Sequence, residues 1–312
     1  MNGGTVDTRL GYFWVLVLLV SLVFTPPAYS QVGDSASDNP NRSALSGEPY
    51  RPRYHLTAPQ NWLGIPNGLV YLDGEYHLFY QHNPAGKMPG AGFWGHAVSP
   101  DLVNWQHRPI ALYPDRSGSV ELGSVVVDEE DTAGFGAGAM VALFSQKLVD
   151  DRVLNLAFST DKGQTWVRYE GNPVVDLTNW FPLAPAPRVF WYDDAGHWVM
   201  VLSSGDDVWF FTSPDLKDWS KASNFGKGAG SHDGAWGAAD LFELSVDGGA
   251  ETAWVLTVST ADGAPARGAG VQYFVGGFDG STFTSRDPAE SERWLDAGAD
   301  FYGSMTWSDA GH

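Results

Sequence analysis

The sequence predicts an all-β protein built as a propeller, and three observations lead to that fold class. The chain is rich in Trp (14), Tyr (12) and Phe (17) alongside 37 Gly and 19 Pro, a composition typical of short strands joined by tight turns. Its apolar runs are short or alternating and do not follow a helical period. A turn motif that ends in an aromatic residue recurs at even intervals, as expected for blades around an axis.

Eight short runs are the expected strands. Turn signals such as Asp73-Gly74 and Asp194-Ala195-Gly196 separate them, and none is long enough to suggest a helix. The runs cover residues 68–72, 76–80, 124–128, 140–144, 198–203, 208–212, 252–258 and 271–275.

The repeated motif is a Ser-x-Asp turn closed by a Trp. It occurs at Ser99–Trp105, Ser159–Trp166 and Ser213–Trp219, and Phe278–Phe283 is a looser fourth copy. The closing aromatic residues are 61, 53 and 64 residues apart (105 to 166, 166 to 219 and 219 to 283). That is the spacing of one four-stranded blade with its loops. We expect the Asp to accept backbone N–H bonds across the turn and the aromatic ring to pack between blades.

The N-terminal region has the pattern of a secretory signal. Residues 1–30 contain Arg9, an apolar run over residues 10–24 and small residues at 28–30, which predicts a cleaved signal peptide and a secreted or periplasmic protein. The run is 15 residues long, short of the roughly 20 that span a bilayer. A retained membrane anchor is the alternative. Residues 31–49 are polar and predict a disordered spacer, so the folded domain is expected over residues 50–312.

Charge and cysteine content exclude several functions. The net charge is −19, from 18 Lys+Arg against 37 Asp+Glu, which argues against nucleic acid and anionic membrane surfaces as partners. A neutral sugar is compatible with this charge, although solubility explains it equally well. The chain has no Cys, hence no disulfide and no thiol nucleophile. No cluster of His, Asp or Glu has metal-ligand spacing, so we expect no metal and no cofactor.

Several segments resemble glycoside hydrolase family 32, which includes invertases, levanases and inulinases. The resemblance starts at Ala58–Tyr71 and continues in the same order as in the family; the other matching segments are 78–84, 93–99, 101–112, 171–175, 188–191, 240–244, 272–280 and 301–309. It implies a five-bladed propeller with a sugar pocket at the axis, followed by a β-sandwich. In this sequence the resemblance implies that the sandwich is absent and the last blade incomplete.

The resemblance also identifies the positions of the catalytic carboxylates. Retaining hydrolysis uses two carboxyl groups about 5–5.5 Å apart, one as nucleophile and one as acid/base. Ile65 stands at the position of the nucleophile, Ala186 at that of the Asp in the Arg-Asp-Pro motif, and Gly237 at that of the acid/base Glu. None of them carries a carboxylate. The expectation is therefore that no catalytic residue is intact and that the protein does not hydrolyse fructosides.

Five residues are expected to bind substrate. Trp62, Asn67, Gln81 and Trp94 match family positions that line the sugar site, and Glu121 is the one new carboxylate expected near it. Gln81 offers two donors and an acceptor to sugar hydroxyls, and the two Trp rings offer flat apolar faces. The alternative for each is structural, with the Trp rings packing the central channel and Gln81 satisfying the backbone of its blade.

Other acids are expected to have structural roles. Asp240 follows Gly237 by three residues, so on a strand its side chain points to the opposite face. Asp233 precedes Gly237 by four residues, roughly 13 Å along an extended strand. Turn-like positions are occupied by Asp128, Asp206 and Asp207. His96 is expected to be a satisfied core histidine, and no nucleophile-elbow motif supports a Ser-His-Asp triad.

The sequence therefore favours a secreted, non-hydrolytic relative of family 32 that binds fructose-containing carbohydrate weakly. An active retaining β-fructosidase, in which Glu121 takes a catalytic role or the reactive motifs align differently, is the first alternative. A propeller that binds protein is the second. A sialidase-type propeller is disfavoured because the sequence shows no clustered arginine triad for a carboxylated sugar.

Overall fold

The structure is a computed structural model, and it describes residues 1, 48–52, 54–90, 92–148, 151–177, 185–308 and 310. One compact unit spans Asn39–His312 and contains every described residue except Met1. Apart from Met1, the predicted signal at 1–30 lies outside the described residues, as does nearly all of the predicted spacer at 31–49. No helix among the described residues is long and apolar enough to cross a membrane.

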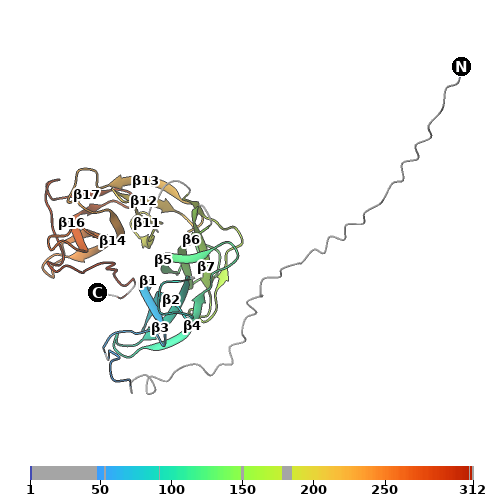
Figure 1. Cartoon of the computed structure of the whole chain (residues 1–312). Helices are drawn as coiled ribbons and strands as arrows, with labels where there is room; N and C mark the ends of the chain where they lie inside the picture. Colours follow the sequence, from blue (N-terminus) through green and yellow to red (C-terminus); the bar gives the residue numbers. More distant parts are fainter. Residues whose placement is uncertain are drawn as a thin grey trace. The chain divides into compact units, whose positions relative to one another are not determined.

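The described residues form antiparallel sheets that follow one another along the chain (Figure 1). The first holds β1 (Trp62–Leu72), β2 (Glu75–Asn83), β3 (Phe93–Ser99) and β4 (Gln106–Leu112). The second holds β5 (Ser119–Asp128), β6 (Ala139–Lys147), β7 (Arg152–Ser159) and β8 (Val167–Arg168), and β9 (Val175–Asp176) also pairs with β7. The third holds β10 (Arg188–Tyr192), β11 (His197–Ser203), β12 (Val208–Ser213) and β13 (Ser220–Phe225). The fourth holds β14 (Trp236–Ser245), β15 (Thr252–Thr260), β16 (Gly270–Phe278) and β17 (Phe283–Ser285).

The all-β propeller prediction is confirmed, but the prediction of five blades is wrong. The described residues form four sheets, each the size of one blade. After β17, described residues 286–308 form only isolated bridges, which join Val70 to Ser308, Ala269 to Asp300 and Gln272 to Trp294. A blade requires strands that pair with one another, and these residues instead pair with β1, with β16 and with the loop before β16. All eight runs predicted as strands lie within strands of the structure.

The repeated turn joins the third and fourth strands of every blade. Asp101 Oδ1 accepts the backbone N–H groups of Val103 (2.9 Å) and Asn104 (2.6 Å), as predicted. Asp215 makes the same contacts in the third blade and Asp279 makes them in the fourth. In the first three copies the closing Trp donates its indole N–H to a backbone carbonyl within the turn. Four copies of the turn therefore correspond to four blades.

The first strands of successive blades lie next to one another: β1 packs beside β5, β5 beside β10 and β10 beside β14. Gly68 allows the close approach of β1 to β5, because a Cβ there would stand 2.5 Å from Val125 Cγ2. Three apolar clusters fill the spaces between neighbouring blades. Each blade is thus held by the apolar face of the next one, which removes that surface from water.

Residues 299–308 connect the fourth blade to the first. Ala299 O accepts the N–H of Ala269, and Phe301 N donates to Ala269 O. Ser308 then exchanges backbone hydrogen bonds with β1, donating to Leu69 O (2.9 Å) and accepting from Tyr71 N (3.0 Å). These contacts join the loop before β16 to β1. Between them, Tyr302 lies near the start of β14 and Gly303 near the start of β1.

Candidate functional site

Three of the positions expected to be catalytic or to bind substrate lie at irregularities near the starts of the first strands. The register of β1 shifts between Leu63 and Pro66, around Ile65. The register of β14 shifts between Trp236 and Ala239, around Gly237, and that of β5 shifts between Val120 and Gly123, around Glu121. Such bulges re-aim side chains and are frequent beside active sites. The structure thus gives Ile65, Gly237 and Glu121 similar settings on three different blades.

Trp62 and Gln81 lie together at the start of β1. The ring of Trp62 occupies the space in which a Cβ of residue 64 would stand, and Gln81 Oε1 lies 3.0 Å from the same point. The Gln81 side chain makes no hydrogen bond to another described residue and is half-buried. The Trp62 carbonyl oxygen is 2.8 Å from Nδ1 of His82, and burial lowers the pKa of His82. Gln81 therefore has unused hydrogen-bonding capacity at this place.

Asn67 and Trp94 serve the packing of the first blade. With its side-chain oxygen directed to the neighbouring strands, Asn67 accepts hydrogen bonds from Gln81 N (3.2 Å) and from Trp94 Nε1 (3.0 Å). Trp94 Nε1 also donates to Glu121 O (2.7 Å), and its ring packs edge-on against Phe144. Trp94 is fully buried, so the flat face expected to receive a sugar ring is covered by protein in this structure.

Glu121 is held by a cation. Its carboxylate lies 2.9 Å from Arg152 Nε, and only 16 % of its side chain is exposed. The ion pair joins β5 to the start of β7 at the side of the second blade. A carboxylate fixed in this way can accept further hydrogen bonds, but its charge is already largely balanced.

Ala186 and Gly237 occur where a small residue fits. Ala186 is buried just before β10. Gly237 accepts a hydrogen bond at its carbonyl oxygen from Ser203 Oγ, and a Cβ at Gly237 would overlap the hydroxyl oxygen of Tyr302. A Cβ added to Gly303, the residue after Tyr302, would stand 3.6 Å from Ile65 Cγ2. Ile65, Gly237 and Tyr302 therefore lie close together, and residues 302 and 303 bring the C-terminal part of the described chain to this place.

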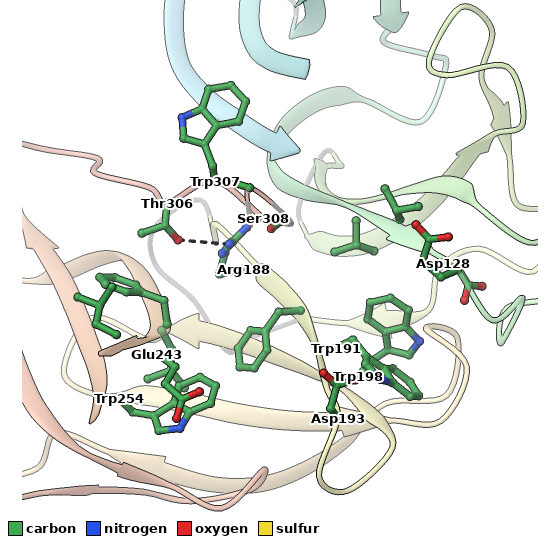
Figure 2. Close-up of a pocket in the computed structure, with 18 of the residues that line it drawn as sticks. Asp128, Arg188, Trp191, Asp193, Trp198, Glu243, Trp254, Thr306, Trp307 and Ser308 are labelled. Carbon is green, nitrogen blue, oxygen red and sulfur yellow. Dashed lines mark hydrogen bonds between the residues drawn. The ribbon is translucent and has the colours of Figure 1, made fainter. Parts of the chain in front are cut away.

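A cavity of about 720 Å³ lies elsewhere, along the later halves of the first strands (Figure 2). Its walls include Val126–Asp128 of β5 and Leu241–Leu244 of β14, together with Thr306–Ser308. Its aromatic walls include Trp191, Trp198, Trp254 and Trp307. The volume is within the range of small-molecule sites. None of the substrate-binding or catalytic positions predicted from sequence lines it.

The polar groups of this cavity are mainly carboxylates. Glu129, Glu130, Asp193 and Glu243 are exposed at its walls. Arg188 also lines it, but its Nε lies 2.8 Å from Asp240 Oδ1 in a buried ion pair. Figure 2 shows Arg188 reaching Thr306, to which its guanidinium donates a hydrogen bond of 3.3 Å. The guanidinium of Arg188 is therefore already bound by Asp240 and Thr306 of the protein itself.

Three of the other acids, Asp240, Asp128 and Asp207, make hydrogen bonds within the protein. Asp240 accepts hydrogen bonds from Arg188 and from the backbone N–H and hydroxyl of Thr306. Asp128 accepts from the N–H groups of Thr132 and Ala133 in the turn after β5. Asp207 accepts from Trp209 Nε1. Each is engaged within the protein rather than directed at Ile65 or Gly237.

His96 lies in the core of the first blade. Its Nε2 is 3.1 Å from His77 Nδ1, and its ring stacks on Phe79. Burial lowers the pKa of His96 to about 3 and that of His77 to about 4. Within the described part of the chain, no group of three or more His, Asp and Glu side chains could hold a metal ion.

The comparisons with known proteins agree with this fold. The model for the N-terminal domain of glycosyl hydrolases family 32 matches residues 55–312. The chain belongs to glycoside hydrolase family 32. It is 48 % identical over 271 residues to a levanase of Bacillus subtilis (strain 168), covering 86 % of this chain and 40 % of that protein. It is 38 % identical over 303 residues to an extracellular exo-inulinase of Aspergillus niger, covering 84 % and 55 %.

Solved structures of the family support the same conclusion. The fructofuranosidase from Schwanniomyces occidentalis complexed with fructose matches with a TM-score of 0.78 and 35 % identity, over 84 % of this chain and 53 % of that chain. An exo-inulinase from Aspergillus awamori matches with a TM-score of 0.74 and 36 % identity, over 82 % and 56 %. This family 32 chain therefore spans about half the length of the relatives it matches.

Sequence reasoning did not assign a role to Tyr302. The residue lies in the segment 301–309 that carries part of the resemblance, but nothing local shows that its hydroxyl reaches Gly237 on β14. The cavity residues Trp191, Trp254, Asp193 and Glu243 were also missed. They come from two blades, and only the packing of β10 beside β14 brings them together.

Proposed function

We propose that this chain is a non-hydrolytic member of family 32 that binds fructose-containing carbohydrate weakly near the start of β1 and β14. The observation that carries the proposal is the identity of three residues, Ile65, Ala186 and Gly237, at the positions that the family resemblance assigns to its carboxylates. A retaining mechanism requires two carboxyl groups on opposite sides of the scissile bond. An alkyl chain, a methyl group and a hydrogen atom provide neither nucleophile nor proton donor.

The surroundings of these residues support the proposal. Tyr302 and the carbonyl oxygen of Ser259 lie nearest to the Cβ position of Gly237, Ser203 donates to the Gly237 carbonyl oxygen, and Gly303 lies beside Ile65. None of these groups is a carboxylate. Glu121, the expected replacement, is paired with Arg152 at 2.9 Å. One carboxylate cannot act as nucleophile and as acid/base on opposite sides of the same bond. A role for Glu121 alone would therefore leave the reaction without its second carboxyl group.

Weak binding follows from what remains. Gln81 has an unused amide and Trp62 a half-buried ring beside it, and both can meet a furanose. The absent carboxylates would each have supplied charged hydrogen bonds worth roughly 1.5–3 kcal/mol. Losing two or three of them lowers affinity by several orders of magnitude, which predicts dissociation constants of about 1 mM or weaker.

The activity test uses sucrose, levan and inulin with purified protein. We expect no release of fructose above the level of a no-enzyme control. The assay should be followed across a final gel-filtration step, because trace contamination by an active relative would otherwise mimic activity. Steady fructose release that co-elutes with the pure protein would overturn the proposal and favour the alternative, an active retaining β-fructosidase.

The binding test uses ligand-observed NMR with fructo-oligosaccharides. We expect weak binding that is reduced in Gln81→Ala and unchanged in Gln106→Ala, a control on β4 whose side chain is exposed. Micromolar binding that persists in Gln81→Ala would place the ligand elsewhere. The cavity beside Trp191 and Trp254 would then be the first place to examine.

The proposal includes export from the cell. Residues 1–30 have the pattern of a cleaved signal, and the related exo-inulinases are described as extracellular. Expression of the whole chain in a secreting host should yield protein in the medium or periplasm that begins at Gln31. Recovery of the intact N-terminus in the membrane fraction would show instead that the apolar segment is retained.

A further inference from the structure

The hydroxyl of Tyr302 occupies the space that a side chain at position 237 would fill. A Cβ added to Gly237 would overlap the Tyr302 hydroxyl oxygen, and the next atom, Tyr302 Cζ, lies 3.3 Å from that point. Gly237 has no positive φ, so its backbone conformation would accept any residue. The hydroxyl of Tyr302, rather than the backbone, is therefore what makes glycine fit at position 237.

The residues on both sides of Tyr302 are held by hydrogen bonds from their backbone N–H groups. Phe301 N donates to Ala269 O (3.3 Å), and Gly303 N donates to Ser259 Oγ (3.1 Å). Gly303 has φ +74, a conformation that glycine adopts without steric cost. This turn directs the Tyr302 ring toward β14 while Gly303 lies against Ile65.

The Tyr302 hydroxyl is available as a hydrogen-bond donor. Burial raises the pKa of Tyr302, and the nearby backbone N–H of Ala238 opposes this only in part, so the hydroxyl keeps its proton at neutral pH. A phenol has its own O–H to donate, and no described residue accepts a hydrogen bond from the Tyr302 hydroxyl. Tyr302 as a residue is 40 % exposed, so it lies at a surface that a ligand can reach.

We propose that the Tyr302 hydroxyl is a sugar-binding donor at the start of β14 and takes the place of a side chain at position 237. This inference rests on the proposed function, because it names a group that would hold the sugar. The ligand is a neutral polyol ring with a hydroxyl or ring oxygen that accepts one hydrogen bond from Tyr302. Gln81, on the first blade, supplies the other hydrogen-bonding partner, so the sugar would lie between β1 and β14.

The first test is a double-mutant cycle on stability, which needs no ligand. Gly237→Ala should lower the melting temperature by about 3–10 °C, because overpacking of this size is destabilising. In a Tyr302→Phe background the same change should cost much less, since the overlapping atom is gone. Gly277→Ala on β16 is the control, because its Cβ would meet nothing within 4 Å. Equal losses in both backgrounds would overturn the proposed placement.

The second test measures binding of fructo-oligosaccharides by calorimetry or ligand-observed NMR. Tyr302→Phe should bind about three- to ten-fold more weakly, the value of one neutral hydrogen bond. Tyr54→Phe, at an exposed tyrosine, should bind like the wild type. Unchanged binding in Tyr302→Phe would overturn the inference and leave the proposed function standing. If the wild-type protein binds no fructo-oligosaccharide, the proposed function fails and the sugar-binding role of Tyr302 fails with it, while the stability cycle still decides the placement.

Discussion

Arg188 and Asp240 form an ion pair of 2.8 Å that is almost entirely removed from solvent, with side-chain exposures of 5 % and 1 %. The pair joins the first strands of the third and fourth blades. Asp240 also accepts the backbone N–H of Thr306 (2.7 Å) and the hydroxyl of the same residue (2.8 Å). One carboxylate thus holds two blades and the segment that reaches back to β1.

Asp240→Asn should destabilise the protein strongly. The change leaves the Arg188 guanidinium buried without a countercharge, and breaking a buried pair in this way typically costs about 3–5 kcal/mol. Urea unfolding followed by tryptophan fluorescence measures the loss. The control is Asp73→Asn, which removes an exposed pair with Lys162 and should cost no more than about 1 kcal/mol. Equal effects of the two changes would show that the buried Arg188–Asp240 pair contributes no more to stability than the exposed pair.

Restoring one catalytic carboxylate should not restore activity. Ile65→Asp alone supplies a nucleophile without an acid/base, and such residues act as a unit in the rate. The combination Gly64→Asn, Ile65→Asp, Ala186→Asp and Gly237→Glu should release some fructose from inulin. Robust turnover by Ile65→Asp alone would show that the acid/base group is not at position 237.

The restored variant should also be less stable than the wild type. A side chain at position 64 would overlap the Trp62 ring, and one at position 237 would overlap the Tyr302 hydroxyl. Thermal melting of the separate Gly64→Asn and Gly237→Glu variants measures this cost. Melting temperatures equal to that of the wild type would mean that Trp62 and Tyr302 move aside freely.

The turn at Asp101 should weaken in acid. Hydrogen bonds from Asn104 and Val103 lower the pKa of Asp101 to about 2, below the ordinary value near 3.8. A carboxyl whose pKa is depressed by folding stabilises the protein above the unfolded-state pKa and loses that effect as pH falls through the folded-state pKa. Asp101→Asn should therefore melt below the wild type at pH 7, and the difference should shrink between about pH 4 and pH 2. A difference that stays constant over this range would contradict the assignment.

His77 and His96 should remain neutral in the folded protein at pH 5. Burial is the main cause that lowers the pKa of His77 to about 4 and that of His96 to about 3. Glu75 and Asp73 oppose the shift at His77, whereas Arg108 and Lys162 add to it. In the unfolded state these histidines bind protons below about pH 6.5. The stability of the folded protein should therefore be unaffected by them above that pH and should fall as the pH drops toward 4. Histidine NMR measures both titrations, and a midpoint near 6.5 for either ring would contradict this prediction.

Much of the fold could be predicted because it depends on local patterns. The Ser-x-Asp turns carry their own hydrogen bonds, so Asp101 and Asp215 could be recognised from a few neighbouring residues. Short strands such as β3 and β10 have no equally clear local pattern and were not predicted. The number of blades was predicted wrongly, because it was inferred from the family resemblance rather than from the four copies of the turn.

The candidate site could be predicted only in part. The family motifs assigned Ile65, Ala186 and Gly237 to the expected catalytic positions. In the structure, the strand register shifts around Ile65 and around Gly237. Burial could not be read from the motif, and Trp94 is covered because neighbouring strands close over it.

The sequence by itself determined the family, the all-β class, the repeated turns and the residue types at the expected catalytic positions, because each of these is a property of contiguous residues. Only the tertiary structure decided which residues distant in sequence come into contact. Tyr302 and Gly237 are 65 positions apart in number (237 to 302), and their contact exists because residues 299–303 are hydrogen-bonded to Ala269 and Ser259. The same holds for Arg188 and Asp240, whose attraction is strong only because packing of β10 against β14 removes both charges from water.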